Sequence, residues 1–540
     1  MAEQMLAADG RPLKASLNRA LRRQKVRALM LIAPLLIFIL VSFVMPIADM
    51  LLRSIENQIV GNTLPRTVVA LQDWDAESGK EPDAPVFEAL ARDLAVAVEG
   101  KNHTKLGSRL NYELTGVSSL FRKTGRGVDE IGESTQDLLE DAVPGFDTRA
   151  AFGIMLGAPE WIGAMGAWAD AGENGPAPAF VAHTAMATAL PDTTALYRDF
   201  VALAIAGNDN PLDEKPWPMF YHVFAQEAQG TAFPEGVTQD AAALFVDGQR
   251  ALDGIAVDDA KAMFLDIEED WANTDVWRTI QTYSPAYTDG YFLNSIDMLK
   301  GHSGAEMRPD DEQIYITLFI RTMIMSLTIM GMCVLLGYPI AWLLANLPDR
   351  TANLLMILVL LPFWTSLLVR TSAWKVLLQQ QGVINEILVG IGLVSDGNRL
   401  ELINNQAGTI IAMTHILLPF MILPLYSVMK TIPPSYLRAA KSLGATDWTA
   451  FWRVYFPQSV PGIGAGCILV FILSIGYYIT PELVGGTKGV FISNRIAYHI
   501  SSSLNWGLAA ALGTILLAIV LILYWLYDRI VGIDNVKLGG

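Results

Sequence analysis

The chain has few groups suited to chemistry of its own. Its 540 residues include only two cysteines, Cys333 and Cys467, and both lie in apolar runs, where a thiol acts as a small hydrophobic side chain. The sequence contains no G-x-x-x-x-G-K-[ST] phosphate loop, no H-E-x-x-H zinc motif and no G-x-S-x-G nucleophile motif. We therefore expect no catalytic residue, metal site or cofactor in this chain.

Charged residues are also scarce, and they are unevenly placed. They make up 17% of the chain, against roughly 25% in ordinary soluble domains, and the hydrophobic share is 52%. Positions 52–310 hold 41 of the 54 acidic and 18 of the 38 basic residues, which gives this block a net charge of −23. The rest of the chain has a net charge of +7, and the two sum to −16. An acidic, water-compatible block is thus inserted into a basic, apolar framework. The negative charge of this block disfavours phosphate binding, so we expect no nucleic-acid partner.

Six apolar runs are long enough to cross a membrane as helices, which need about 20 residues each. The runs are 28–48, 322–345, 351–369, 402–429, 454–481 and 500–527. They predict an all-α polytopic membrane protein with six transmembrane helices. The expected segments are a basic N-terminus (1–27), a first helix (28–50), an acidic insertion (51–312), helices two to six with a loop at 430–453 (313–530), and a C-terminus (531–540).

Basic residues near the ends of the runs predict the orientation, because Lys and Arg tend to stay in the cytoplasm. Seven basic residues precede the first run, and the 430–453 loop contains Lys430, Arg438, Lys441 and Arg453. Both termini and this loop are therefore expected inside, and the acidic insertion outside. A cleaved signal peptide is the competing interpretation of the first run, although no clear A-x-A site precedes Asp49.

The acidic insertion is long enough for one or two independent domains. Segments such as 135–142 and 179–206 have helical spacing, and turns rich in Gly, Pro and Asn separate them. We predict a mainly helical extracytoplasmic domain in which most of the six tryptophans are core residues. The acidic run Asp266–Asp270 is interpreted as a solvated face rather than a cation site.

The loop between the fourth and fifth runs contains the pattern of a short helix. Pro433 and Pro434 favour its start, Ser435 is a candidate cap, and Gly444 can end it with a positive φ. One side of this helix carries small or apolar residues, namely Ala439, Ala440 and Leu443. Because so short a helix is unstable alone, we expect it to dock into a groove on a cytoplasmic partner.

This loop resembles the EAA motif of ABC importer permeases, which couples the permease to its ATPase. Ala439, Ala440 and Gly444 match that motif, whereas Arg438 stands where the family usually has glutamate, and Phe456 replaces the leucine of its L-P pair. The resemblance implies alternating access driven by two ATP-binding subunits, which would hold ATP and magnesium. The implied ATPase-coupling residues are Tyr436, Arg438, Ala439, Ala440, Leu443, Gly444 and Ala445.

The framework resembles the PotB-type permeases of spermidine/putrescine importers over residues 28–50 and 314–530. The motifs that carry this resemblance are Gly337-Tyr338-Pro339, Leu361 to Thr371, Leu418-Pro419-Phe420, Leu423 to Tyr426, Thr480 to Gly486 and Asn505-Trp506. The resemblance implies the type I ABC importer permease fold in a bacterial inner membrane, a PotC-like second permease and a periplasmic substrate-binding protein. The implied cargo is a polyamine or a related cationic amine. The acidic insertion is not covered.

Polar and aromatic residues near the spans are candidates for the substrate path, because such groups are costly in lipid. Glu482 is the carboxylate that suits a cationic substrate, and tyrosine or tryptophan faces attract ammonium groups. The candidates are Trp364, Arg370, His415, Tyr477, Tyr478 and Glu482. Snorkelling of Arg370 to headgroups and an internal hydrogen bond of His415 are the structural alternatives.

The sequence therefore predicts the non-catalytic permease subunit of a binding-protein-dependent ABC importer. Three alternatives stay open. The cargo of the permease could be an amino acid or an opine-like solute. The chain could be a secondary transporter without an ATPase, which co-purification would reveal. A transmembrane receptor would need a cytoplasmic signalling domain, and only about a dozen residues follow the last run.

Overall fold

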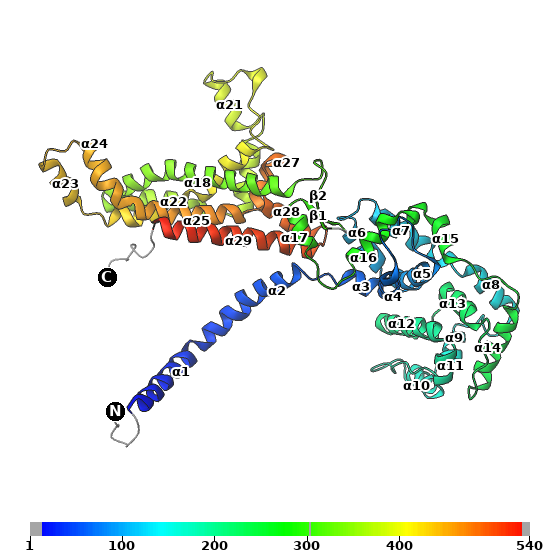
Figure 1. Ribbon diagram of the computed structural model, residues 1–540. Coiled ribbons are helices and arrows are strands. Elements are labelled where there is room, and N and C mark those ends of the chain that lie inside the picture. The colour runs from blue at the N-terminus through cyan, green and yellow to red at the C-terminus, as the bar shows by residue number, and fades with distance from the viewer. Residues whose placement is uncertain (1–12, 302–303, 532–540) are drawn as a thin grey trace. The chain divides into compact units, whose positions relative to one another are not determined.

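The computed structural model describes residues 13–301 and 304–531, and nearly all of their regular structure is helical. The strands β1 (Met298–Gly301) and β2 (Gly304–Met307) form a two-stranded sheet (Figure 1). The chain divides into two compact units. We name one the insertion unit, which comprises Glu56–Thr288 and Leu299–Glu306. We name the other the bundle unit, which comprises the described residues of Met1–Ile55, Asp289–Met298 and Met307–Gly540.

The bundle unit contains five helices long and apolar enough to cross a membrane, or six if one bent pair counts as a single span. Three of the five are single helices, α18 (Tyr315–Asn346), α22 (Gln406–Lys430) and α29 (Trp506–Val531). The other two contain π turns. One joins α1 (Leu13–Ile39), η1 (Leu40–Val44) and α2 (Met45–Arg53), and the other joins α24 (Asp447–Ala450), η7 (Phe451–Tyr455) and α25 (Phe456–Gly476). The predicted all-α polytopic fold is confirmed.

The third predicted span is not one continuous helix. α19 (Asp349–Leu360) and η5 (Leu361–Trp364) meet α20 (Leu367–Leu377) at a bend of 95°. Thr365 and Ser366 adopt extended backbone there, and the Thr365 hydroxyl donates to the Pro362 carbonyl at 2.9 Å. Proline alone does not break a span, since Pro419, Pro424 and Pro461 lie inside continuous helices.

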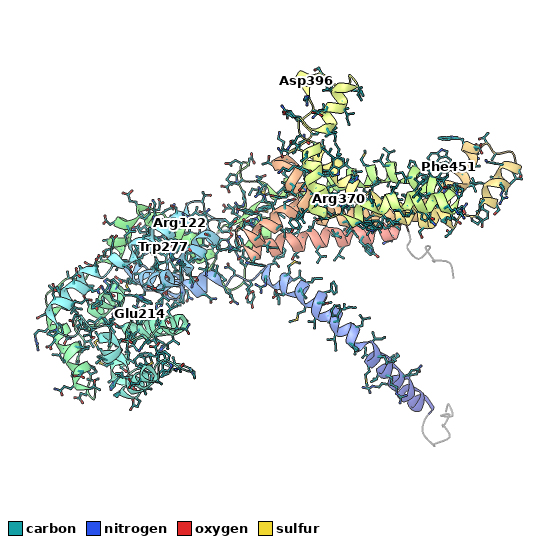
Figure 2. The ribbon with its side chains drawn as sticks, turned by 180° about the vertical axis from the view of Figure 1, so that it is seen from behind. Arg122, Glu214, Trp277, Arg370, Asp396 and Phe451 are labelled. Carbon is teal, nitrogen blue, oxygen red and sulfur yellow. The ribbon has the colours of Figure 1, made fainter. Side chains whose placement is uncertain are left out.

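Beyond this bend, α21 (Val383–Gly390) and η6 (Asp396–Asn398) project away from the long helices (Figure 1), with Asp396 at the tip (Figure 2). The buried Asn385 closes the projecting segment on itself. Its amide donates to the carbonyls of Gln379 and Leu400 and accepts from the Leu400 N–H at 3.0 Å. The projection is therefore an ordered part of the bundle unit.

Helices α18, α22 and α25 pack together through small residues and methionines. A Cβ on Gly466 would lie 2.5 Å from the Met421 sulfur, and one on Gly462 would lie 3.2 Å from the Leu425 Cα. Such close approach is typical of membrane helices, which have no hydrophobic effect to hold them together within lipid. By contrast, the large apolar side chains at positions 29–39 of α1 are exposed.

The end of the predicted 51–312 insertion belongs to the bundle unit. There α17 (Gly290–Ser295) packs on α29, with the Tyr291 ring against Gly507. The buried Asp297, at φ +58°, accepts hydrogen bonds from the N–H groups of Ile314, Tyr315 and Ile316 at 3.0, 2.9 and 2.7 Å. These contacts satisfy donors at the start of α18 that have no partner within the helix.

The insertion unit is helical, as predicted. Its longer helices are α5 (Ala84–Glu99), α6 (Asn102–Leu110), α7 (Val117–Gly127), α8 (Glu133–Ala142), α10 (Pro159–Asp170), α12 (Pro191–Gly207), α13 (Pro218–Ala228), α14 (Gln239–Ala251), α15 (Ala260–Ile267) and α16 (Thr274–Thr282). Shorter ones are α3 (Ile59–Thr63), α4 (Pro65–Ala70), α9 (Ala151–Leu156) and α11 (Thr184–Ala189). α8 matches the predicted segment 135–142. α11 and α12 cover most of the predicted segment 179–206, but residues 179–183 are not helical.

Aromatic rings dominate the core of the insertion unit. Trp271 and Trp277 are fully buried with ring centroids 5.1 Å apart, and Phe87 meets Trp277 edge-on at 4.8 Å. Four of the six tryptophans are buried and the other two are half-buried, which confirms their predicted core role. Buried aromatic pairs of this kind contribute more than their area alone.

Candidate functional site

The predicted coupling helix exists as α23 (Pro434–Ser442), at the end of the bundle marked by Phe451 (Figures 1 and 2). Pro434 occupies its first turn, as expected, but Pro433 is the capping residue and Ser435 makes no capping hydrogen bond. The prediction for Gly444 is confirmed, since its φ is +89°. The Gly444 N–H donates to the Lys441 carbonyl at 3.0 Å and the Ala445 N–H to the Ala440 carbonyl at 3.1 Å, which is the Schellman helix end.

α23 packs on η7 through its half-buried Leu437 and leaves most of its surface open. Leu443 is 90% exposed and Tyr436 is 50% exposed. Arg438 and Ala439 are exposed, whereas Ala440 and Ala445 are half-buried. A short helix with uncovered apolar side chains is the form of a docking element.

Within the bundle, Arg370 on α20, His415 on α22 and Tyr477 after α25 come together. The Trp374 indole donates to His415 Nδ1 at 3.1 Å, and the two rings lie edge to face. Arg370 is near enough to act electrostatically on both His415 and Tyr477. Its Nε is buried without a hydrogen-bond partner among the described residues. These residues form an inner polar group, which we name the Arg370 group.

A second polar site is a pocket of about 760 Å³ between the start of α18 and the segments α26 (Ile479–Val484), α27 (Gly486–Gly489) and α28 (Ile492–Ser501). Tyr478 and Glu482 line it. The Asn494 amide donates to the Glu482 carboxylate at 2.6 Å and to the Tyr478 carbonyl at 2.9 Å. Both candidates are thereby held at fixed positions in the wall of this pocket, which we name the Glu482 pocket.

Two arginines also line the Glu482 pocket, and each has an internal partner. Arg321 donates to the Thr487 carbonyl at 3.0 Å, and the Arg495 guanidinium lies 5.7 Å from the centre of the Tyr498 ring. Behind the pocket, the buried His499 bonds to the Tyr315 hydroxyl at 3.0 Å and to Ser503 at 2.8 Å. Burial, together with the nearby Arg495 charge, lowers the pKa of His499 to about 4, so the ring is neutral at physiological pH.

The six path candidates therefore separate into three places. Arg370, His415 and Tyr477 form the inner group, and Tyr478 and Glu482 line the pocket. Trp364 lies apart from both on η5, 75% exposed. A hydrogen bond of 3.1 Å between the buried hydroxyls of Thr371 and Thr480 joins α20, which carries Arg370, to α26, which carries Glu482.

Sequence reasoning missed Asn494, Arg321, Arg495 and Tyr498. Arg321 lies directly before the second apolar run, so the boundary of the run excluded it. Asn494 stands twelve residues after Glu482, and no local pattern pairs the two. Only the packing of α26 to α28 beside the start of α18 brings these four side chains to one pocket.

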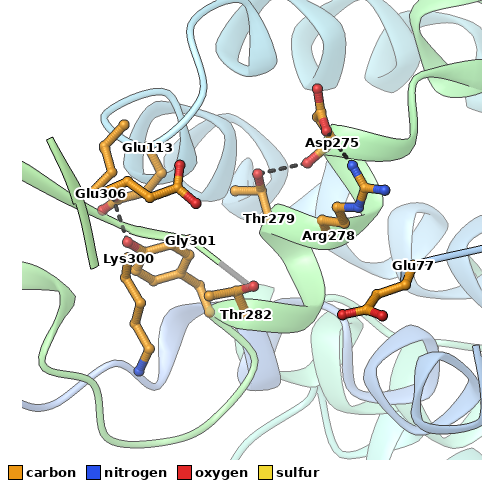
Figure 3. Close-up of a pocket in the computed structure, with 11 residues that line it drawn as sticks. Glu77, Glu113, Asp275, Arg278, Thr279, Thr282, Lys300, Gly301 and Glu306 are labelled. Carbon is orange, nitrogen blue, oxygen red and sulfur yellow. Dashed lines mark hydrogen bonds and ion pairs between the residues drawn. The ribbon is translucent and has the colours of Figure 1, made fainter. Parts of the chain in front are cut away.

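The insertion unit contains a polar cavity of about 450 Å³ (Figure 3). Two of its four carboxylates already have partners. Glu113 accepts from Arg109 at 2.5 Å and from the Tyr283 hydroxyl at 2.7 Å, and Asp275 pairs with Arg278 at 2.9 Å. Burial and the Glu113 charge raise the pKa of Tyr283, which stays protonated. No group of three or more His, Cys, Asp or Glu side chains suited to a metal occurs in residues 13–301 and 304–531.

The bundle of long apolar helices, with polar residues between them, is the architecture of a polytopic membrane protein. Residues 337–531 match the family model described as binding-protein-dependent transport system inner membrane component. The chain belongs to this family, and it is accordingly a permease subunit of a binding-protein-dependent ABC importer in the inner membrane.

Several curated relatives support this assignment. The chain is 35% identical over 222 residues to the spermidine/putrescine transport system permease protein PotB of Salmonella typhimurium, covering 41% of this chain and 77% of that protein. The Escherichia coli PotB is also 35% identical, with 80% of it covered. The inner membrane ABC transporter permease protein YdcU of Escherichia coli is 33% identical over 227 residues, which cover 40% of this chain and 71% of that protein.

Among solved structures, a chain of a bacterial alginate ABC transporter, in complex with an alginate pentasaccharide-bound periplasmic protein, matches with a TM-score of 0.34 and 20% identity. The match covers 51% of this chain and 98% of that one.

Proposed function

We propose that this permease imports a small organic cation of the polyamine type. The observation that carries the proposal is the Glu482 pocket, in which a carboxylate fixed by Asn494 shares the lining with Tyr478. A carboxylate pairs with an ammonium group, and tyrosine faces attract it through cation–π contact. The names of the relatives, spermidine/putrescine permeases, point to the same class of solute.

The test is uptake of radiolabelled putrescine and spermidine by proteoliposomes that contain the complete importer. Glu482→Gln removes the charge at nearly constant shape, and we expect roughly tenfold lower uptake at limiting substrate. Glu386→Gln is the matched control, because Glu386 is an exposed carboxylate on α21 that does not line the pocket. Equal uptake by wild type and Glu482→Gln would reject a role for the pocket in cation import.

A second class of solute is favoured by Arg370. Its guanidinium makes no ion pair with any described residue, and a planar guanidinium suits a carboxylate. An amino acid or opine-like solute would use Arg370 for its carboxylate. In that case γ-aminobutyrate or a basic amino acid would compete with putrescine for uptake, and Arg370→Lys would remove the competition.

The family membership supports a proposal for the partner subunits. We propose two ATP-binding subunits, which hold ATP and magnesium, a PotC-like second permease subunit and a periplasmic substrate-binding protein. α23 would transmit closure of the ATP-binding subunits to the bundle, giving alternating access without catalysis by this chain. Co-purification of an ATPase with the tagged permease tests this proposal, and its failure would favour a secondary transporter.

We also propose that both termini and α23 are cytoplasmic and that the insertion unit is periplasmic. Most of the predicted terminal tails lie outside the described residues. Cysteines introduced at Ser442 and at Gly236, both exposed, give the test, because only the second should react with a membrane-impermeant maleimide in intact spheroplasts. Labelling at Ser442 would contradict this orientation.

The insertion unit would dock or orient the substrate-binding protein. Its chain enters and leaves side by side, since the Asn57 N–H donates to the Ala286 carbonyl at 2.8 Å and Glu56 bridges Tyr287. A short Gly-Ser linker can therefore replace residues 58–285. Loss of stimulation by the binding protein is expected, and unchanged affinity for it would reject this role.

A further inference from the structure

The outward surface of α23 combines uncovered apolar side chains with an unneutralised cation. Leu443 and Tyr436 are 90% and 50% exposed, and Trp448, at the start of α24, is 71% exposed. Arg438 is exposed on the same short helix. The element is nevertheless ordered, because its end is closed by the Gly444 turn and its base packs on η7.

The helical period places these side chains relative to one another. At about 100° per residue, the half-buried Leu437 and Ala440 face the bundle, which turns a strip of small residues outward. This strip consists of Ser435, Ala439 and Ser442. Tyr436 and Leu443, seven residues apart, border the strip on one side, and Arg438 borders it on the other. Because the side chains of this strip are small, the helix backbone can approach the wall of a groove closely. The larger flanking side chains then determine which groove the helix can bind.

The two cations of α23 differ in their pairing among the described residues, since Lys441 has a carboxylate partner and Arg438 has none. Lys430 pairs with Asp349 at 2.9 Å, and Lys441 pairs with Asp447. Among the described residues, no carboxylate lies within ion-pair distance of Arg438, and its guanidinium makes no hydrogen bond. A guanidinium brought into an interface needs an anionic partner to offset its desolvation.

We propose that the docking groove of the ATP-binding subunit is apolar where it receives Leu443 and Tyr436 and carries a carboxylate opposite Arg438. This inference rests on the proposed partnership with ATP-binding subunits and specifies its chemistry. The Arg438 contact selects the cognate subunit, because a groove with a basic residue at that position would repel this helix.

The experiment measures binding of the purified cognate ATP-binding subunit to the permease pair in nanodiscs. Arg438→Glu should weaken binding roughly tenfold or more, and Arg438→Lys should retain most of it. Arg350→Glu is the matched control, since Arg350 is an exposed arginine outside α23, and it should bind like wild type. Individual changes of groove carboxylates to lysine in the ATP-binding subunit should include one that restores binding to Arg438→Glu.

The outcomes separate this inference from the proposal it rests on. If wild type binds no ATP-binding subunit, the proposed partnership is wrong. If wild type binds and Arg438→Glu binds equally well, the partnership stands and the acidic groove is rejected. Retained pairing of Arg438→Glu with the second permease shows that the variant is folded. Affinity that falls with salt for wild type, but not for Arg438→Met, is the independent signature of the charge pair.

Discussion

The insertion unit and the bundle unit differ in which residue types they bury and which they expose. The insertion unit buries large rings such as Trp271 and Phe121 and satisfies its charges internally, as Asp93 does with Arg66 and Thr67. The bundle unit buries Gly, Ala and Met at helix contacts and exposes leucine and isoleucine outward. The difference shows which solvent each unit meets, because exposed apolar surface is costly in water and costless in lipid.

The largest expected effect concerns the aromatic core. Trp271 lies within 5.1 to 5.7 Å of the rings of Phe121, Phe264 and Trp277, and its indole donates to Thr124. Trp271→Ala should lower the free energy of unfolding of the insertion unit by about 3–5 kcal/mol. Urea-dependent proteolysis of the full-length chain measures this loss. Trp448→Ala, at an exposed tryptophan of the bundle unit, should leave the free energy of unfolding unchanged. Equal losses for the two variants would contradict the stated difference between the two units.

The next effect depends on pH. Burial alone would raise the pKa of Glu88, but the hydrogen bond and charge of His222, at 2.9 Å, outweigh it and lower this pKa. A lowered carboxyl pKa adds stability above the unfolded-state pKa, and this stability is lost as the pH falls through the folded-state value. Glu88→Gln should therefore destabilise the insertion unit by about 1–3 kcal/mol at pH 7 and by much less at pH 3.

Unfolding of the Glu88→Gln variant at the two pH values is the measurement. Glu173→Gln, at an exposed residue of the same unit, is the control and should show no pH-dependent loss. A constant deficit at both pH values would contradict the role of the ionised Glu88 carboxylate.

A smaller effect concerns backbone strain at α23. A Cβ on Gly444 would meet no atom within 4 Å, so the cost of Gly444→Ala comes from its φ of +89° alone. We expect about 1 kcal/mol, seen as faster amide exchange over residues 441–446. Gly331→Ala, inside α18 and equally free of close atoms, should not accelerate exchange there.

The smallest effect concerns the outer surface of the bundle. Leu335 on α18 is 66% exposed, whereas Ile329 on the same helix is fully buried. In bilayers, Leu335→Ala should change stability by less than about 0.5 kcal/mol, while Ile329→Ala should cost about 2–5 kcal/mol. A steric-trap unfolding assay compares them, and a large loss at Leu335 would mean that another protein surface covers this position.

Much of the bundle followed from sequence because its signals are local. The apolar runs gave the long helices, and the proline pair with Gly444 gave both ends of α23. The sequence marks Pro362, next to the 95° bend, no differently from Pro419 and Pro424, which lie inside the continuous helix α22. Proline alone therefore does not tell a broken span from a continuous one. The boundary of the insertion was also displaced, since Asp297 and α17 lie in an acidic, polar stretch yet pack against α18 and α29.

The sequence predicted single residues of the candidate site, but it did not predict which of them lie together in space. Glu482 and Tyr478 stood out as polar groups near a span, yet their common support, Asn494, carries no such signal. Arg370 and His415 were proposed separately and lie together.

The sequence by itself determined which segments enter the membrane and where the short helix α23 begins and ends, because transfer into lipid and helix ending are properties of consecutive residues. Only the tertiary structure decided which polar groups meet. Glu482 with Asn494, Trp374 with His415 and Asp297 with the start of α18 are joined through space, by directional hydrogen bonds that exist only once the helices have packed.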